Sequence, residues 1–194
     1  MMAMSIIIIY HDTENYENYK ELEEDIKNNL NNAILIPISE IDKIKLNHDD
    51  KVISLIPLRG GHNKSIEQIS KKYNIILYKL PIELILKGII SNLRSNKCDE
   101  LCIVYWKAKR LVNEQEEDLN YLIENIKNNL KISNVSLDCN KCYKCVIALT
   151  MLKGKLSENA LKMKEKCNSF VIEDLYSISK SDIINWIKNV SRQQ

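Results

Sequence analysis

The sequence predicts an α/β fold of two similar lobes, each with a parallel sheet, and a cleft between the lobes. Short apolar segments rich in β-branched residues alternate with longer amphipathic segments, which is typical of the strands and helices of a parallel sheet. Residues 6–10 form one such apolar run, as expected for a strand that helices cover on both faces. The order of segments in the second half resembles that in the first, which indicates a duplicated unit.

Residues 1–96 are predicted to form the first lobe. Its strands are expected at 6–10, 33–38, 51–58 and 75–78. A helix that Thr13 can cap is expected after the first strand, because apolar side chains recur there at helical spacing, at Tyr19, Leu22, Ile26 and Leu30. Two more helices are expected at 64–72 and 82–93. This alternation predicts right-handed crossovers.

Residues 97–194 are predicted to form the second lobe. A strand at 101–106 and a helix at 114–130 repeat the opening of the first lobe, and a last strand is expected at 170–172. Residues 146–155 match 53–62, because both segments are apolar strands that end in a basic loop with glycine. The short run 135–137 lies too close to Val146 for a parallel crossover, which takes about a dozen residues. This strand is therefore expected to be shortened, antiparallel or absent.

The composition excludes several classes of protein. With 28 Lys and Arg against 26 Asp and Glu, the net charge is +2, which gives no electrostatic basis for nucleic-acid binding. No apolar run approaches the ~20 residues of a membrane span, and the first residues lack the basic region of a signal peptide. We therefore expect a cytoplasmic protein with no membrane partner. Glycine-rich nucleotide-binding motifs are absent, which predicts a reaction without nucleotide.

Two of the three histidines follow predicted strands. His11 comes directly after the first strand, and His62 follows the predicted strand 51–58. Carboxyl ends of parallel strands meet at one edge of a sheet, where ligands usually bind, so we expect the two side chains to lie close together. Imidazole binds cobalt, nickel, iron and zinc, although two loop histidines can also meet by chance. His48 precedes a strand and is expected at the surface of the opposite edge.

The two histidine segments resemble a known enzyme family. The segments IIYHDT at 8–13 and LIPLRGGH at 55–62 resemble motifs of the class II chelatases. This family comprises the sirohydrochlorin cobaltochelatases and ferrochelatases. In that family one strand runs into a His-Gly-Ser turn and a later strand into a Pro-Leu…Gly-x-His loop; here Asp12 and Thr13 replace the Gly-Ser. The resemblance implies insertion of cobalt or iron into sirohydrochlorin or a related tetrapyrrole of cobalamin or siroheme biosynthesis, with His11 and His62 holding the metal.

That reaction needs further groups around the metal. Insertion removes two pyrrole protons, and Glu40, at the end of the predicted strand 33–38, is the expected proton acceptor. Sirohydrochlorin carries many carboxylates, which basic side chains at this edge are expected to bind, although any single one could be an ordinary solvated residue. These are Arg59, Lys64, Lys107, Lys109, Arg110, Lys153 and Lys155. In the second repeat, Trp106 and Lys155 are expected near the positions that correspond to His11 and His62. The chain is therefore expected to have at most one metal-binding pair of histidines.

All 6 cysteines lie in the second half. A C-x2-C-x2-C motif, whose spacing suits thiolate ligation of an iron–sulfur cluster or of zinc, is formed by Cys139, Cys142 and Cys145. A fourth ligand would come from Cys98, Cys102 or Cys167. Cys98, Cys102, Cys145 and Cys167 stand at or just before the starts of predicted strands, which is the edge opposite the histidines. The site is therefore expected far from the histidines, with a structural or redox-sensing role. Buried free thiols and disulfides are the alternatives, and disulfides are rare in the cytosol outside hyperthermophiles.

Two other functions fit the same sequence. One is a non-catalytic carrier or sensor of a metal or a tetrapyrrole, in which the cysteines matter more than the histidines. The other is an α/β interaction module without a metal site. Trp106 and Trp186 are expected in the core or in the wall of the cleft. Because two fused repeats can close the cleft within one chain, the protein is expected to be a monomer or a homodimer.

Overall fold

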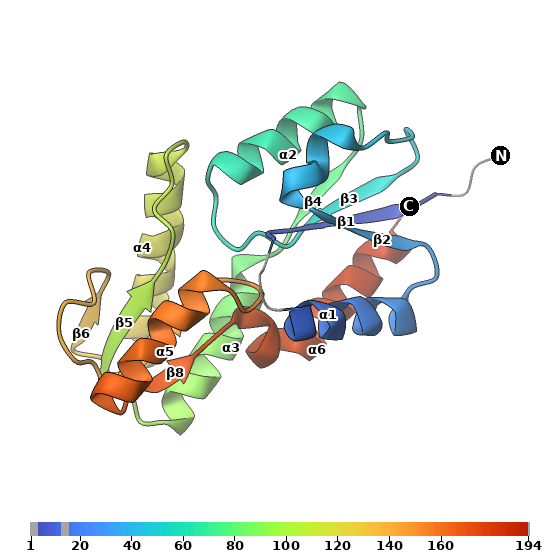
Figure 1. The fold of residues 1–194 in the computed structure, drawn as a ribbon. Coiled ribbons are helices and arrows are strands. Elements are labelled where there is room, and N and C mark those ends of the chain that lie inside the picture. The colour runs from blue at the N-terminus through green and yellow to red at the C-terminus, as the bar shows by residue number, and fades with distance from the viewer. Residues whose placement is uncertain (1–3, 13–15, 194) are drawn as a thin grey trace.

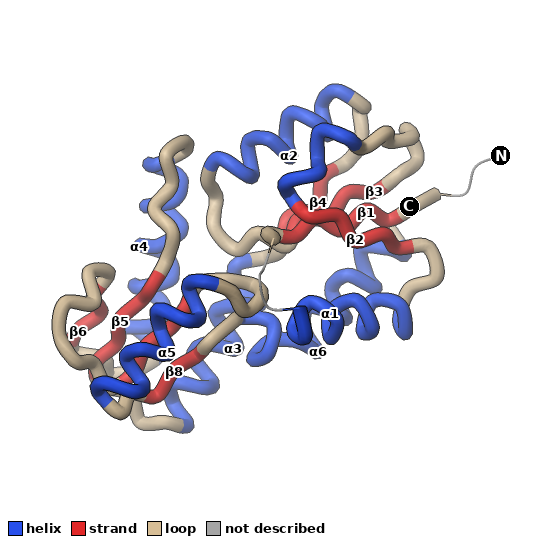
Figure 2. The backbone as a smooth tube through the Cα atoms, viewed as in Figure 1, coloured by secondary structure: helices blue, strands red, loops and turns tan. Residues whose placement is uncertain are grey.

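A computed structural model describes residues 4–12 and 16–193. It contains two four-stranded sheets with the strand orders β2-β1-β3-β4 and β6-β5-β7-β8, and every recorded pairing is parallel. Figure 1 and Figure 2 show the two sheets in separate lobes with helices on both faces of each sheet. The predicted α/β fold with two similar lobes is confirmed, and the matching strand orders confirm the repeat.

The first lobe follows the predicted order of elements. Its strands are β1 (Ile6–Tyr10), β2 (Ala33–Pro37), β3 (Lys51–Ser54) and β4 (Leu77–Lys79). Its helices are α1 (Tyr16–Asn29), the short 3-10 helix η1 (Ile38–Lys43), α2 (Gly61–Lys72) and α3 (Ile82–Ser95). β3 ends earlier than predicted, because residues 55–60 leave the sheet to form the loop before His62. Thr13, the predicted helix cap, lies outside the described residues.

The second lobe repeats this order. Its strands are β5 (Glu100–Val104), β6 (Asn134–Ser136), β7 (Cys145–Ala148) and β8 (Phe170–Ile172). Its helices are α4 (Val112–Asn129), α5 (Lys155–Cys167) and α6 (Leu175–Arg192). Asp174 caps α6, since its side chain accepts a hydrogen bond from the Ser177 backbone N–H at 2.9 Å. In the described part of the chain, none of the helices combines the length and the apolar character that crossing a membrane requires.

The segment between β6 and β7 is shorter than a usual parallel crossover, as the sequence indicated. β6 is parallel to β5, with Asn134 opposite Glu100, but it has 3 residues and so spans only about 10 Å. The chain can return over that distance as a plain loop, without a crossover helix. The strand is therefore shortened, which is one of the three predicted outcomes.

The cysteines correct the prediction of an iron–sulfur or zinc site. All six are paired in three disulfides, Cys98–Cys145, Cys102–Cys139 and Cys142–Cys167. The paired Cα atoms lie 5.4–6.0 Å apart, which is the ordinary range for a disulfide. Cys102–Cys139 and Cys142–Cys167 join the β6–β7 loop to β5 and α5, and Cys98–Cys145 joins the start of β7 to the segment before β5. No thiolate therefore remains to bind a metal or a cluster.

The two lobes exchange their last helices. Figure 1 shows α3 running beneath the second lobe and α6 running beneath the first, beside α1. The Lys51 ammonium in β3 donates to the Val190 carbonyl at the end of α6, at 2.9 Å, and Tyr121 in α4 donates to Glu83 in α3 at 3.4 Å. One apolar core therefore runs through both lobes, with α3 and α6 packed at its centre.

The contact between α3 and α6 depends on Gly88. A Cβ atom at this position would lie 2.2 Å from the Ser179 hydroxyl and 3.1 Å from the Ile178 carbonyl oxygen. We expect Gly88→Val to lower the free energy of unfolding by about 1–3 kcal/mol, because the two helices must move apart. Urea unfolding monitored by circular dichroism measures this change. Ser91→Val, on the exposed side of α3, is the matched control, and an equal effect of both substitutions would contradict the packing argument.

Candidate functional site

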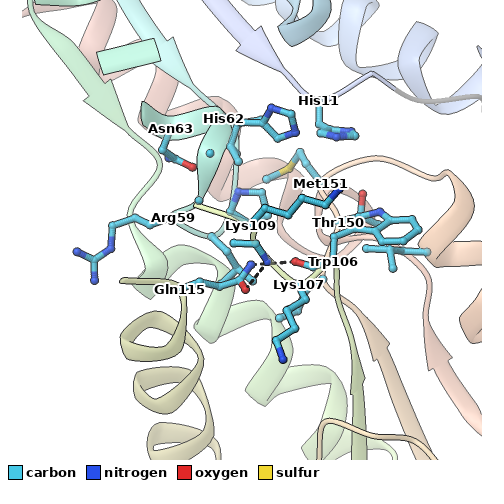
Figure 3. Close-up of a pocket in the computed structure, with 18 of the residues that line it drawn as sticks. His11, Arg59, His62, Asn63, Trp106, Lys107, Lys109, Gln115, Thr150 and Met151 are labelled. Atoms are coloured by element: carbon cyan, nitrogen blue, oxygen red, sulfur yellow. Dashed lines mark hydrogen bonds between the residues drawn. The ribbon is translucent and has the colours of Figure 1, made fainter. Parts of the chain in front are cut away.

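The structure brings His11 and His62 together. His11 follows β1, and His62 lies in the first turn of α2, so the carboxyl edge of the sheet positions both. Their ring centroids are 5.0 Å apart, with the rings inclined at 70° (Figure 3). One metal bound to a nitrogen of each ring at about 2.1 Å, with an angle at the metal of about 90–110°, places the centroids about 4.5–5.2 Å apart. The observed separation therefore suits two ligands on one ion.

Both imidazoles are prepared for metal binding. The Nδ1 atom of His11 lies 2.9 Å from the Asp12 carbonyl oxygen. Because this oxygen can only accept a hydrogen bond, the neutral tautomer that fits the contact has its proton on Nδ1 and its lone pair on Nε2. Loss of water around His62 and the neighbouring His11 ring lower the pKa of His62 below its ordinary value. A lowered pKa favours the uncharged ring, which is the form that binds a metal.

A cavity of about 680 Å³ opens between the lobes beside the histidines. We call it the central cavity. Its first-lobe wall contains both histidines and the Arg59-Gly60-Gly61 turn, and its second-lobe wall contains loops after β5 and β7. The predicted basic residues that line it are Arg59, Lys107, Lys109, Arg110 and Lys155. The side chains of Lys64 and Lys153 are not among its walls.

A second, smaller pocket of about 430 Å³ borders the histidine pair and η1; we call it the side pocket. His11, Asp12 and His62 line both this side pocket and the central cavity. The other ionisable residue of the side pocket is Asp42, so its charged groups are acidic where those of the central cavity are mainly basic. Glu40, the predicted proton acceptor, is exposed on η1 and lines neither space.

The described residues supply no third metal ligand beside the histidine pair. Among residues 4–12 and 16–193, no group of three or more His, Cys, Asp or Glu side chains is placed to hold a metal ion. Structural metal sites usually have four protein ligands, whereas sites that act on a substrate keep positions open. An ion bound by His11 and His62 would keep most of its coordination positions for water and for a second molecule.

Arg59 is held in a contact between the lobes. Its backbone N–H and its Nε donate to the Asp118 carboxylate in α4 at 2.8 and 3.0 Å, and its Nη2 donates to Glu117 at 3.0 Å. The hydrogen bond to Asp118 raises the pKa of Arg59 above its ordinary value. In Figure 3 its guanidinium group points away from the histidines. Arg59 therefore closes the end of the cavity rather than offering a free cation to it.

Asp118 is expected to stabilise the contact between the two lobes. Asp118→Ala removes the acceptor of two hydrogen bonds from Arg59, and we expect a loss of about 1 kcal/mol, modest because the Arg59 side chain is 38% exposed and water screens the pair. Glu117→Ala is the matched control, since its side chain is 69% exposed, and its effect should be near zero. Chemical unfolding of both variants tests this, and equal values would show that Asp118 has no special role.

The register of the two lobes identifies the second-lobe counterparts of the histidines. Leu55 N–H donates to the Ile9 carbonyl and Leu149 N–H to the Val104 carbonyl, each at 2.9 Å. Ile9 therefore corresponds to Val104, which places Trp106 at the position of His11 as the sequence predicted. Gly60 and Gly154 cap α2 and α5. Leu156, and not Lys155, thus occupies the position of His62, because the predicted match of the two segments is shifted by one residue.

Two residues of the site were missed by the sequence analysis. Gln115 is 6% exposed, accepts from the Ala108 N–H and donates to the Trp106 carbonyl, each at 2.9 Å, and so fixes the loop after β5 (Figure 3). The sequence could have revealed Gln115, because it is a polar residue at helical spacing from the buried Leu119 and Leu122 of the same helix. Asp118 gives no such signal, because its partner lies in the other lobe.

Comparison with solved structures identifies the fold. SirB, a sirohydrochlorin chelatase from Bacillus subtilis subspecies spizizenii solved in complex with cobalt, matches with a TM-score of 0.62 and 13% identity over 97% of this chain and 95% of its own. CbiX, the terminal enzyme for biosynthesis of siroheme in denitrifying bacteria, matches with a TM-score of 0.61 and 6% identity over 98% of this chain and 100% of its own. The chain has the class II chelatase fold. No protein-family model matches the sequence, and no curated protein matches it either.

In this class II chelatase fold, the central cavity occupies the usual ligand position of an α/β protein. Both its walls come from loops that follow strands or begin helices at the carboxyl edges of the two sheets. Open parallel sheets bind ligands at this edge. The histidine pair therefore lies at the edge where proteins of this architecture usually bind ligands.

Proposed function

We propose that this protein inserts a divalent metal ion, cobalt or iron, into sirohydrochlorin or a related tetrapyrrole. The observation that carries the proposal is the pair of imidazoles, 5.0 Å apart, at the wall of a cavity of about 680 Å³. A cavity of this size suits an organic molecule of several hundred cubic ångströms. The reaction would belong to cobalamin or siroheme biosynthesis.

The proposed roles of the side chains follow from their positions. His11 and His62 bind the metal substrate and leave its other positions open, so that pyrrole nitrogens can replace water one by one. The four exposed cations Lys107, Lys109, Arg110 and Lys155 bind carboxylates of the macrocycle. The overall step is balanced, since the ring loses two N–H protons as it gains the dication.

Asp12 is the proposed proton acceptor in place of Glu40. Asp12 lines both spaces beside the histidines, whereas Glu40 lines neither. One carboxylate oxygen of Asp12 accepts from the Ser39 hydroxyl at 2.5 Å, and the other accepts from the Ser39 backbone N–H at 3.4 Å. These bonds fix the carboxylate at the boundary of the two spaces, where it can receive pyrrole protons directly or through water.

The solved relatives support the same substrate class. SirB is a sirohydrochlorin chelatase that was solved with cobalt, and CbiX acts in siroheme biosynthesis. Since identity is 13% and 6%, the metal and the tetrapyrrole of this chain are assigned by proposal. One chain supplies both walls of the central cavity, so a monomer suffices for the proposed reaction.

An insertion assay tests the proposal. Purified protein is mixed without oxygen with sirohydrochlorin and either Co²⁺ or Fe²⁺, and the absorbance change of the metallated ring is followed. We expect insertion faster than the spontaneous reaction, with many products formed per protein molecule. A single product per protein would indicate a carrier, and no acceleration with either metal would overturn the enzyme assignment.

A further inference from the structure

The two walls of the central cavity differ in chemistry although the lobes are repeats. Where the first lobe places His11 and His62, the second lobe places Trp106 and Leu156, and all four line the cavity. Neither tryptophan nor leucine binds a divalent metal. The second lobe thus has an apolar pair at the positions where the first lobe has two imidazoles.

Trp106 is unusually open for so large an apolar side chain. It is 53% exposed, whereas Leu156 is 4% exposed and Met151, another residue of this wall, is 2% exposed. Figure 3 shows Trp106 on the second-lobe side of the cavity, away from the two histidines. An exposed aromatic side chain inside a cavity, next to buried apolar residues, is a surface for an apolar ligand face.

The backbone of Trp106 is fixed although its side chain is open. The buried amide of Gln115 holds the Trp106 carbonyl and the Ala108 N–H, each at 2.9 Å. The four residues after Trp106 include three cations of the cavity wall, Lys107, Lys109 and Arg110. The segment 106–110 therefore joins an aromatic face to several positive charges, which matches a flat ring that carries carboxylates at its edge.

We propose that Trp106 is the stacking platform on which one face of the macrocycle lies, while the histidine pair presents the metal to the ring from the first lobe. This inference rests on the proposed function, because it assumes a tetrapyrrole in the central cavity. It adds a positioning residue to the site and gives the two lobes different roles: the first lobe presents the metal, and the second lobe holds the ring. It also accounts for the single histidine pair in a duplicated fold.

Tryptophan fluorescence tests the contact directly. The chain has two tryptophans, and Trp186→Phe leaves Trp106 as the sole emitter. Metal-free sirohydrochlorin is titrated into this variant, and binding is followed in parallel by absorbance. Quenching of Trp106 emission that follows the binding curve is expected. Unchanged emission, corrected for absorption of light by the ligand, while absorbance reports binding would overturn the proposal.

Kinetics of Trp106 variants separate positioning from folding. In Trp106→Ala we expect KM for the tetrapyrrole to rise about three- to tenfold, the loss expected for one aromatic contact, with kcat changed little and cobalt affinity unchanged. Trp106→Phe should recover most of the loss. Equal KM values for wild type and Trp106→Ala would overturn the proposal, as would a parallel loss of cobalt affinity, which would indicate structural damage.

The two proposals fail in different ways. If the wild-type protein neither binds sirohydrochlorin nor accelerates insertion, the proposed function fails and the stacking role fails with it. If the wild-type protein inserts metal but Trp106→Ala has the same KM, the function stands and the stacking role alone is wrong.

Discussion

Replacing either His11 or His62 by Ala is expected to reduce cobalt insertion by a factor of about 100 or more. Losing one imidazole leaves a single protein ligand, because the described part of the chain offers no third metal-binding group beside the pair. Even groups that only support metal ligands contribute factors of about 10–100, so a direct ligand should contribute at least as much. The rate of insertion at fixed sirohydrochlorin, measured over a range of Co²⁺ concentrations, gives the effect.

The loss should be specific to the metal. Binding of metal-free sirohydrochlorin is expected to change little in either variant, because the cations of the cavity wall and Trp106 remain. His48→Ala is the matched control, since His48 is exposed and lies beside Asp49 at 3.3 Å, away from both cavities. Normal insertion by His11→Ala or His62→Ala would show that the pair does not hold the metal.

Removing one disulfide from the second lobe is expected to lower the free energy of unfolding by about 3–4 kcal/mol. The bridges Cys98–Cys145 and Cys142–Cys167 close segments with sequence separations of 47 and 25, and cross-links of this length restrict the unfolded chain by about that amount. In a domain of this size the melting temperature should fall by about 10 °C. Thermal unfolding of Cys142→Ala/Cys167→Ala against wild type measures the change.

The disulfides should stabilise the lobe without taking part in metal binding. The cysteines lie in the second lobe, whereas both proposed ligands lie in the first, so the double variant should bind cobalt normally at a temperature where it is folded. Equal melting temperatures in the presence and absence of reductant would contradict the structural role. Disulfides are uncommon in the cytosol of most organisms, so the thiol content of protein isolated under alkylation also tests the predicted cytoplasmic location.

Periodicity predicted the elements that are long or wholly apolar. Residues 6–10 form β1 as expected, and the alternation of strands and helices gave the parallel fold and the repeat. The carboxyl-edge rule predicted that His11 and His62 lie close together, because the rule depends only on strand direction. These features are local in the chain, or follow from topology alone.

The features that the sequence did not reveal depend on contacts between distant segments. The exchange of α3 and α6 between lobes brings Gly88 against Ser179, a contact between distant segments that has no local signal. Arg59 lies in the predicted loop, but its guanidinium group is bound by α4 of the other lobe. Glu40 follows β2 as expected, yet η1 carries its side chain outward, since Ile38 and Ile41 of the same helix face the core. The spacing of the cysteines suits both a cluster and disulfides, and only the fold separates the two.

X-ray absorption spectroscopy of the protein loaded with one equivalent of Co²⁺ tests the central claim most directly, because it reports which atoms surround the ion. The account predicts a shell of nitrogen and oxygen at about 2.1 Å with outer-shell scattering from two imidazole rings, reduced to one ring in His62→Ala. Sulfur in the first shell, or a spectrum without imidazole, would contradict the assignment of His11 and His62 as a shared metal site.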